Sequence, residues 1–169
     1  MRCWFVRFRP GLASVLFAVA CASQQFDGSV YRSDELHFRV GLVPSSWRRV
    51  DADSALLAFR DDQSSSTIAV NGRCGVDGDD VPLSALTQHL FLEFTDRSMA
   101  SQSSVSLNGR QALRSELTAS LDGVRKHYVV YVLKKDGCVY DFMLITGSNA
   151  AANSGSDFER FVQGFATLE

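Results

Sequence analysis

Residues 127–146 read HYVVYVLKKDGCVYDFMLIT, two apolar runs joined by Asp136-Gly137. An Asp-Gly pair between apolar runs predicts a two-residue hairpin, because a type I′ turn needs positive φ at both central residues. The expected pairs are Leu133 with Tyr140, Tyr131 with Phe142 and Val129 with Leu144. Both faces of this hairpin are apolar, so we expect it in the middle of a sheet that is covered on both sides.

The segments around the hairpin predict an α+β fold, an antiparallel sheet with helices packed on it. Asn108-Gly109 and Asp122-Gly123 are two more Asx-Gly turns and extend the hairpin into a four-stranded meander. Further strands are expected at 30–31, 36–40, 55–59, 67–74 and 105–107. One helix is predicted from the apolar stripe Leu83, Leu86, Leu90, Phe91 and Phe94. A second follows a capping box, Ser156 to Glu159, and carries Phe158, Phe161, Val162 and Phe165.

The first 21 residues have the layout of a secretory signal peptide. Arginines precede a short apolar run, 11–20, that is too short to persist as a membrane-spanning helix. Ala18-Val19-Ala20 before Cys21 resembles the lipobox of bacterial lipoproteins, although Ala18 stands where Leu is usual. The resemblance implies cleavage before Cys21 and acylation of Cys21. The alternative is ordinary cleavage after Ala20, which gives a secreted or soluble periplasmic protein.

The sequence thus divides into a signal peptide (1–20), a lipidated N-terminus with a tether (21–29) and one globular domain (30–169). Ala22 in place of Asp implies, by the same resemblance, the periplasmic face of the outer membrane. Apolar content of 46% and charged content of 21% are ordinary for a globular protein. Without the three leader arginines, 14 basic and 19 acidic residues remain. A net charge of about −5 disfavours nucleic acid and anionic membrane surfaces as partners.

Cys74 and Cys138 each lie at a strand end beside a turn. Two thiols seldom stay free in an oxidising compartment, so we predict a disulfide that closes a loop of about 65 residues. The alternative is two separate buried thiols, since cysteine packs well in cores. A metal site is disfavoured, because the sequence has no C-x-x-C and no histidine near either cysteine.

The remaining polar candidates indicate no catalytic site. His37, His89 and His127 are scattered and form no H-E-x-x-H, and G-x-S-x-G is absent from the sequence. Asp77, Asp79 and Asp80 could bind Ca²⁺, but the twelve-residue loop with its closing Glu is missing, which favours a solvated loop before a helix.

Asp141 lies between Tyr140 and Phe142 in an otherwise apolar strand. A buried carboxylate needs a partner, or its pKa shifts. We expect a structural pair with an arginine or with backbone amides, and a functional acid is the alternative.

Three motifs resemble the PsbP-like superfamily. Phe38-x-Val40 leads to Pro44-Ser-Ser-Trp47, as in the opening of that fold. Asn108-Gly109-Arg110 with Ala112 is similar to its central hairpin, and the helix with Phe158, Val162 and Phe165 is similar to its last element. The resemblance spans roughly residues 28–168 and implies an antiparallel sheet sandwiched between helices. Members include lumenal photosystem II accessory proteins and bacterial lipoproteins without an assigned role, and no metal-binding or photosystem-binding residue can be transferred from them.

The sequence therefore favours a non-enzymatic envelope lipoprotein that binds or supports a protein partner. No catalytic residue, metal ligand or cofactor is predicted. Two alternatives remain: a binder of a small ligand or metal in a pocket between sheet and helix, and an unrecognised hydrolase. An exposed apolar patch favours the first function, a concave pocket with convergent polar groups the second, and titrating groups together in a cleft the third.

Overall fold

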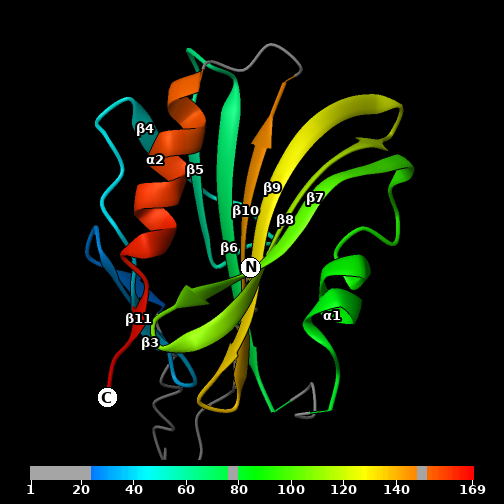
Figure 1. Ribbon diagram of the computed structural model, residues 1–169. Coiled ribbons are helices and arrows are strands. Elements are labelled where there is room, and N and C mark those ends of the chain that lie inside the picture. The colour runs from blue at the N-terminus through cyan, green and yellow to red at the C-terminus, as the bar shows by residue number, and fades with distance from the viewer. Residues whose placement is uncertain (1–23, 76–79, 148–151) are drawn as a thin grey trace, which may run out of the picture.

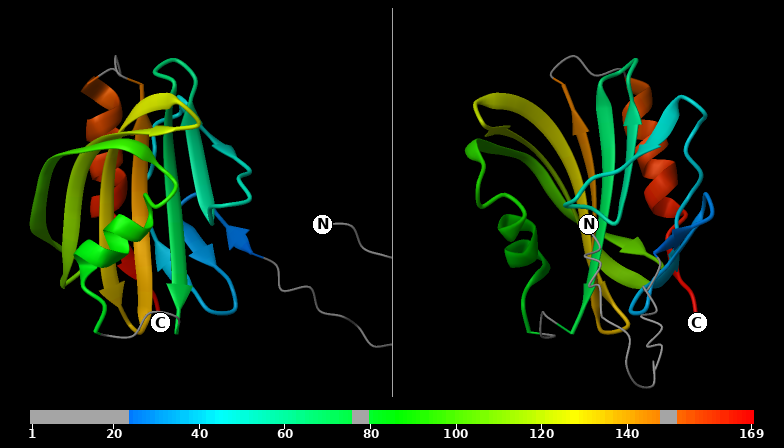
Figure 2. Two further views of the ribbon diagram at one scale, coloured as in Figure 1. Left: turned by 90° about the vertical axis from the view of Figure 1, so that its right-hand side faces the viewer. Right: turned by 180° about the vertical axis from the view of Figure 1, so that it is seen from behind.

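A large twisted antiparallel sheet forms the centre of the molecule, with one helix on each side (Figure 1; Figure 2). The computed structural model describes residues 24–75, 80–147 and 152–169. The seven strands are, in spatial order, β4 (Trp47–Val50), β5 (Leu57–Asp61), β6 (Ser66–Cys74), β10 (Cys138–Thr146), β9 (Val124–Lys135), β8 (Arg110–Leu121) and β7 (Thr95–Leu107). The helices are α1 (Leu83–His89) and α2 (Ala152–Gln163). A smaller sheet contains β1 (Gln25–Phe26), β2 (Val30–Arg32), β3 (His37–Arg39) and β11 (Ala166–Thr167).

The central hairpin has the predicted turn and the predicted pairing. Asp136 and Gly137 have φ of 53° and 74°, as a type I′ turn requires. Leu133 faces Tyr140, Tyr131 faces Phe142 and Val129 faces Leu144. The hairpin strands β9 and β10 lie inside the sheet between β8 and β6. The predicted fold class and the predicted meander from β7 to β10 are both confirmed.

Each face of the hairpin is covered by its own apolar cluster. On the α2 side, Phe165 connects the two sheets: its ring lies 4.9 Å from Tyr140, 5.1 Å from Phe142 and 5.9 Å from Phe38. On the α1 side, the buried residues are Leu86, Phe91, Leu117, Ala119, Tyr128, Val130, Val132 and Val139. Burial on both faces explains why these two strands read as almost continuous apolar runs.

Each predicted helix differs from the observed helix at one end. The stripe that we expected to be helical as far as Phe94 leaves the helix after His89, although Phe91 and Phe94 still pack on Tyr128 at 5.3 and 5.4 Å. The capping box is wrong, because α2 begins at Ala152 and the carboxylate of Glu159 contacts side chains of the sheet.

The globular domain begins earlier than predicted. Gln25 and Phe26 were expected in the tether, but they pair with Arg32 and Tyr31 of β2. The Phe26 ring also lies 5.8 Å from that of Phe59. The strand expected at 55–59 is β5, two residues further on. Among the described residues, no helix is long and apolar enough to cross a membrane.

Candidate partner-binding edge and polar clusters

Cys74 and Cys138 are joined by a disulfide. They occupy facing positions on β6 and β10, with Cα atoms 4.0 Å apart. Because the two sulfurs are bonded to each other, neither residue has a free thiol that could serve as a nucleophile or a metal ligand. A disulfide is typical of proteins that fold outside the reducing cytosol.

Asp141 is a buried carboxylate with a cationic partner. Its side chain lies on the α1 side of β10, and the residue is 3% exposed. Arg73 on β6 places Nη1 3.3 Å from its Oδ2, and Asn71 faces it across the strands. Burial raises the pKa of Asp141, and the charge of Arg73 and the hydrogen bond from Asn71 oppose that rise. This is the environment of a structural pair.

The raised pKa gives stability a pH dependence of known sign. The folded protein holds the Asp141 proton to higher pH than the unfolded chain does, so stability falls as pH rises from the ordinary carboxyl range through the folded pKa. We expect Asp141→Asn to raise the urea midpoint at about pH 7 relative to the midpoint at about pH 4, compared with the same pair of midpoints in the wild type.

Asp62→Asn is the matched control for that titration. Arg48 and Arg60 lower the pKa of the exposed Asp62 carboxylate, so its contribution is present at neutral pH and is lost in acid. The control should therefore change the pH dependence in the opposite direction. An Asp141→Asn variant with the pH dependence of the wild type would contradict the assignment.

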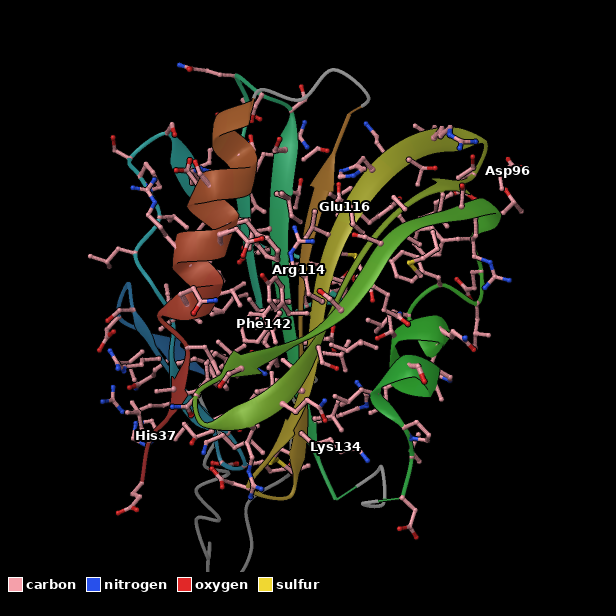
Figure 3. All side chains as sticks on the ribbon, in the orientation of Figure 1. His37, Asp96, Arg114, Glu116, Lys134 and Phe142 are labelled. Carbon is pink, nitrogen blue, oxygen red and sulfur yellow. A yellow bond between two sulfur atoms is a disulfide. The ribbon has the colours of Figure 1, made fainter. Side chains whose placement is uncertain are left out.

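A second polar cluster joins α2 to β8 and β9. Arg114 donates from Nε to Glu159 at 3.1 Å and from Nη1 to Glu116 at 3.3 Å. His127 Nε2 lies 3.0 Å from the other oxygen of Glu116, and the Tyr131 hydroxyl donates to Glu159. Figure 3 shows Arg114 and Glu116 in the space between α2 and the twisted strands.

The charged and polar groups of this cluster pair with one another and link α2 to the sheet. Burial and the neighbouring Glu159 raise the pKa of Tyr131 to about 12, so its hydroxyl keeps the proton that it donates. Burial alone would lower the pKa of Arg114, but its hydrogen bond and charge pairing with Glu159 raise it. Each of the five side chains already has a partner within the set. The arrangement therefore fixes α2 against the sheet and does not resemble an acid and base that await a substrate.

The other candidates from the sequence are not brought together. His37, His89 and His127 lie on β3, α1 and β9, on different elements. In the described ranges, no group of three or more His, Cys, Asp or Glu side chains could hold a metal ion. Of the three aspartates considered as Ca²⁺ ligands, Asp77 and Asp79 lie outside the described residues, and Asp80 is exposed.

An apolar pocket lies between α1 and the outer strands, and we refer to it as the α1 pocket. Its volume is about 440 Å³, and it is lined by Thr87, Gln88, Phe91, Leu92, Arg97, Met99 and Leu117. Leu92 and Met99 on its wall are 64% and 50% exposed. Two of its polar groups already have partners, since Arg97 donates to the Phe91 carbonyl at 3.2 Å and Thr87 to the Leu83 carbonyl at 2.9 Å. The pocket therefore fits an apolar side chain better than a polar small molecule.

Strand β7 is the last strand of the large sheet and has thirteen residues. Its first half has two irregularities, near Asp96 and near Ala100, whereas Ser101–Leu107 pairs with β8 without interruption. None of the described strands pairs with the outer side of this second half, which we call the β7 edge. Its side chains are mostly serine, and it has neither the charges nor the proline that often protect an edge.

The sequence did not point to this edge. We expected a strand only at 105–107, because Thr95–Ser104 has no apolar alternation. Residues 95–104 are exposed on both faces, so no alternating pattern is required of them. The available signal was the Asn108-Gly109 turn, which predicts a strand before it but does not set the length of that strand.

Comparison with known proteins identifies the fold. No protein-family model matches the sequence, and no curated protein matches it. The solution structure of CyanoP, the cyanobacterial PsbP of Synechocystis sp. PCC 6803, superposes with a TM-score of 0.60 at 17% identity and covers 94% of this chain and 98% of CyanoP. LpqN of Mycobacterium tuberculosis, described as involved in cell envelope biogenesis, gives 0.56 at 14% identity over 80% and 87% of the two chains. PA94 of Pseudomonas aeruginosa, of unknown function, gives 0.53 at 12% identity over 83% and 97%.

These similarities establish a PsbP-like α+β fold, in agreement with the resemblance found in the sequence. At such identities they establish the fold alone, and activity must be argued from the site. The distinctive site here is an open strand edge beside an apolar pocket.

Proposed function

We propose that this protein is a non-enzymatic accessory module that binds a partner protein at the β7 edge. The partner adds an extended segment to the large sheet and places an apolar side chain in the α1 pocket. The observation that carries this proposal is a long, exposed edge strand whose first half lines an apolar pocket through Arg97 and Met99, and whose second half, Ser101–Leu107, is regular and open. In this mode of recognition, main-chain hydrogen bonds provide affinity and a side-chain pocket provides specificity.

The composition of the β7 edge favours strand addition. Ser101, Ser103 and Ser104 are exposed, small and uncharged, so they leave the backbone accessible to a second strand. The opposite edge of the sheet, β4, has only four residues and offers fewer hydrogen bonds. The large apolar side chains of Leu92 and Met99 next to the edge are of the kind that an interface covers.

We also propose that the protein is exported and held by lipid on Cys21 at the periplasmic face of the outer membrane. The signal-like leader, the cysteine after Ala18-Val19-Ala20 and the Cys74–Cys138 disulfide support this location. The non-enzymatic assignment is supported by the two polar clusters, in which the titrating groups are paired with one another. Binding of a small ligand is less favoured, because Arg97 and Thr87 in the α1 pocket are already bonded to the backbone.

Photo-crosslinking tests the β7 edge. Benzoylphenylalanine at Ser103 should give one discrete crosslinked product in the envelope of the host, whereas Ser54, an exposed serine in the turn between β4 and β5, should give none. Met99→Asp should lower the yield from Ser103 about tenfold or more, because a charge replaces an apolar contact at the pocket.

Leu42→Asp is the matched control, since Leu42 is 74% exposed and does not line the α1 pocket. Its crosslinking yield from Ser103 should equal that of the wild type. Equal products from Ser103 and Ser54, or a yield that is insensitive to Met99→Asp, would reject the proposed site. A product of twice the mature mass would identify a second copy of this chain as the occupant and would overturn the proposal of a different partner.

A further inference from the structure

The lipid anchor and the folded domain are separated by very little chain. Only Ala22 and Ser23 lie between Cys21 and Gln24, the first described residue. Three residues of chain span at most about 11 Å, whatever their conformation. Gln25 and Phe26 are already part of the domain through their pairing with β2. A lipid on Cys21 therefore holds one particular end of the domain at the membrane surface.

That end contains the turn between β9 and β10. Gln24 lines a cavity together with Glu35 of the β2–β3 turn and Gly72 of β6. Directly after β6, the Gly75 N–H donates at 3.2 Å to the carbonyl of Gly137, in the Asp136-Gly137 turn. The turn lies at the lower end of the sheet in Figure 1. Gln24 and the β9–β10 turn thus belong to the same end of the molecule, which we call the anchored end.

The β7 edge also starts from the anchored end. Arg110, directly after the turn that joins β7 to β8, lines a cavity with Lys135 and Asp136 of the β9–β10 turn. The opposite end of the sheet is distant, because the twelve residues of β9 separate its two turns by roughly 36 Å. Strand β7 therefore runs between the anchored end and the far end of the sheet, and its regular half, Ser101–Leu107, is the half nearest the membrane.

We infer that the molecule stands on the membrane with its anchored end down, and that the strand received by the β7 edge belongs to a protein of the same membrane. This inference rests on the anchor and the edge that we proposed above. With a tether of about 11 Å, the domain meets segments that emerge from the membrane at high effective concentration. Partners that are free in solution gain no such advantage.

Charge does not produce this orientation. The anchored end carries Arg110, Lys134 and Lys135, but also Asp34, Glu35 and Asp136. The residues that line these two cavities carry three positive and three negative charges, so we attribute the orientation to the short tether and not to attraction to anionic headgroups. The orientation is therefore expected to be the same on neutral and on anionic vesicles.

Fluorescence quenching tests the orientation on the acylated full-length mature protein in phosphatidylcholine vesicles. Arg110→Cys and Leu121→Cys are exposed sites at opposite ends of β8, and each is labelled with nitrobenzoxadiazole at its single free thiol. A nitroxide on the lipid headgroup should quench the label at position 110 several-fold more than the label at position 121, with the same ratio in vesicles that contain phosphatidylglycerol. Equal quenching at the two sites would overturn the orientation.

A longer tether tests the location of the partner. A Gly/Ser insert of about 30 residues between Ser23 and Gln24 has a root-mean-square length of about 30 Å. The insert should equalise quenching at the two positions and lower the crosslinking yield from Ser103 several-fold. A yield that does not depend on tether length would overturn the inference that the partner lies in the same membrane.

The proposed function and the further inference are contradicted by different results. An intact mass without acyl groups would reject the anchor at Cys21, and absence of a crosslink from Ser103 with either tether would reject the β7 edge. Neither of those results resembles the failure of the inference, in which acylation and crosslinking are normal but quenching or tether dependence is not.

Discussion

Replacing Cys74 and Cys138 together by alanine is expected to lower the free energy of unfolding by about 4 kcal/mol. The two residues are 64 positions apart in the sequence, so the disulfide closes a long loop in the unfolded chain. In the chain-entropy account, the bond raises stability because the unfolded chain loses conformations that a cross-linked loop cannot adopt. The native fold should survive, since β6 and β10 remain paired from Thr67 and Ile145 to the strand ends.

Urea unfolding followed by circular dichroism measures this effect. The native spectrum of the variant should match that of the wild type, while its unfolding midpoint falls. A reductant provides the control, because it should lower the midpoint of the wild type to that of the double variant and leave the variant unchanged. A double variant as stable as the oxidised wild type would show that the loop contributes nothing to stability.

Gly164→Ala is expected to destabilise the protein by about 3 kcal/mol. Gly164 follows α2 directly, and there the chain passes against the end of β3. The Gly41 N–H donates to the Phe161 carbonyl at 2.8 Å, which holds the two backbones together. A Cβ on Gly164 would overlap the N and Cα atoms of Gly41 and lie 3.1 Å from the Val40 carbonyl carbon. Because these are backbone atoms, the helix end must move away from the strand.

Gly155→Ala, inside α2, is the matched control. No atom lies within 4 Å of a Cβ built on Gly155, and alanine is a better helix former than glycine. The control should therefore raise the free energy of unfolding by about 0.5–1 kcal/mol. Opposite signs for the same substitution at the two ends of α2 are the expected result in urea unfolding. Equal effects would mean that the close approach of Gly41 and Gly164 does not limit packing.

The elements that the sequence predicted well are those whose signals are local. The turn at Asp136-Gly137 follows from two adjacent residues that accept positive φ, and the pairing of Tyr131 with Phe142 follows from the length of that turn. The disulfide was expected for another reason, because two thiols seldom stay free in an oxidising compartment, and each of these cysteines stands beside a turn at a strand end. The turn and the pairing depend on neighbours in the chain, and the disulfide prediction depends on the expected compartment.

The errors arose where distant residues decide between local alternatives. Glu159 has the spacing of a capping residue, but in the folded protein it meets Arg114 and Tyr131, which lie far away in the sequence. A charge-assisted pair of this kind outweighs a local hydrogen bond at a helix start. The helix over Leu83–His89 likewise ends before Phe94, because the chain must enter β7 at Thr95 and pair with β8.

The sequence by itself determined the central hairpin, the meander, the α+β class and the buried position of Asp141, because turn chemistry and the period of two are written in adjacent residues. Only the tertiary structure decided which arginine pairs with Asp141, how closely Gly41 and Gly164 approach, and that β7 forms the open edge of the sheet. Over residues 95–104 this edge strand needs no apolar pattern, since neither of its faces is buried there. The candidate binding edge therefore became visible only when the other strands were in place.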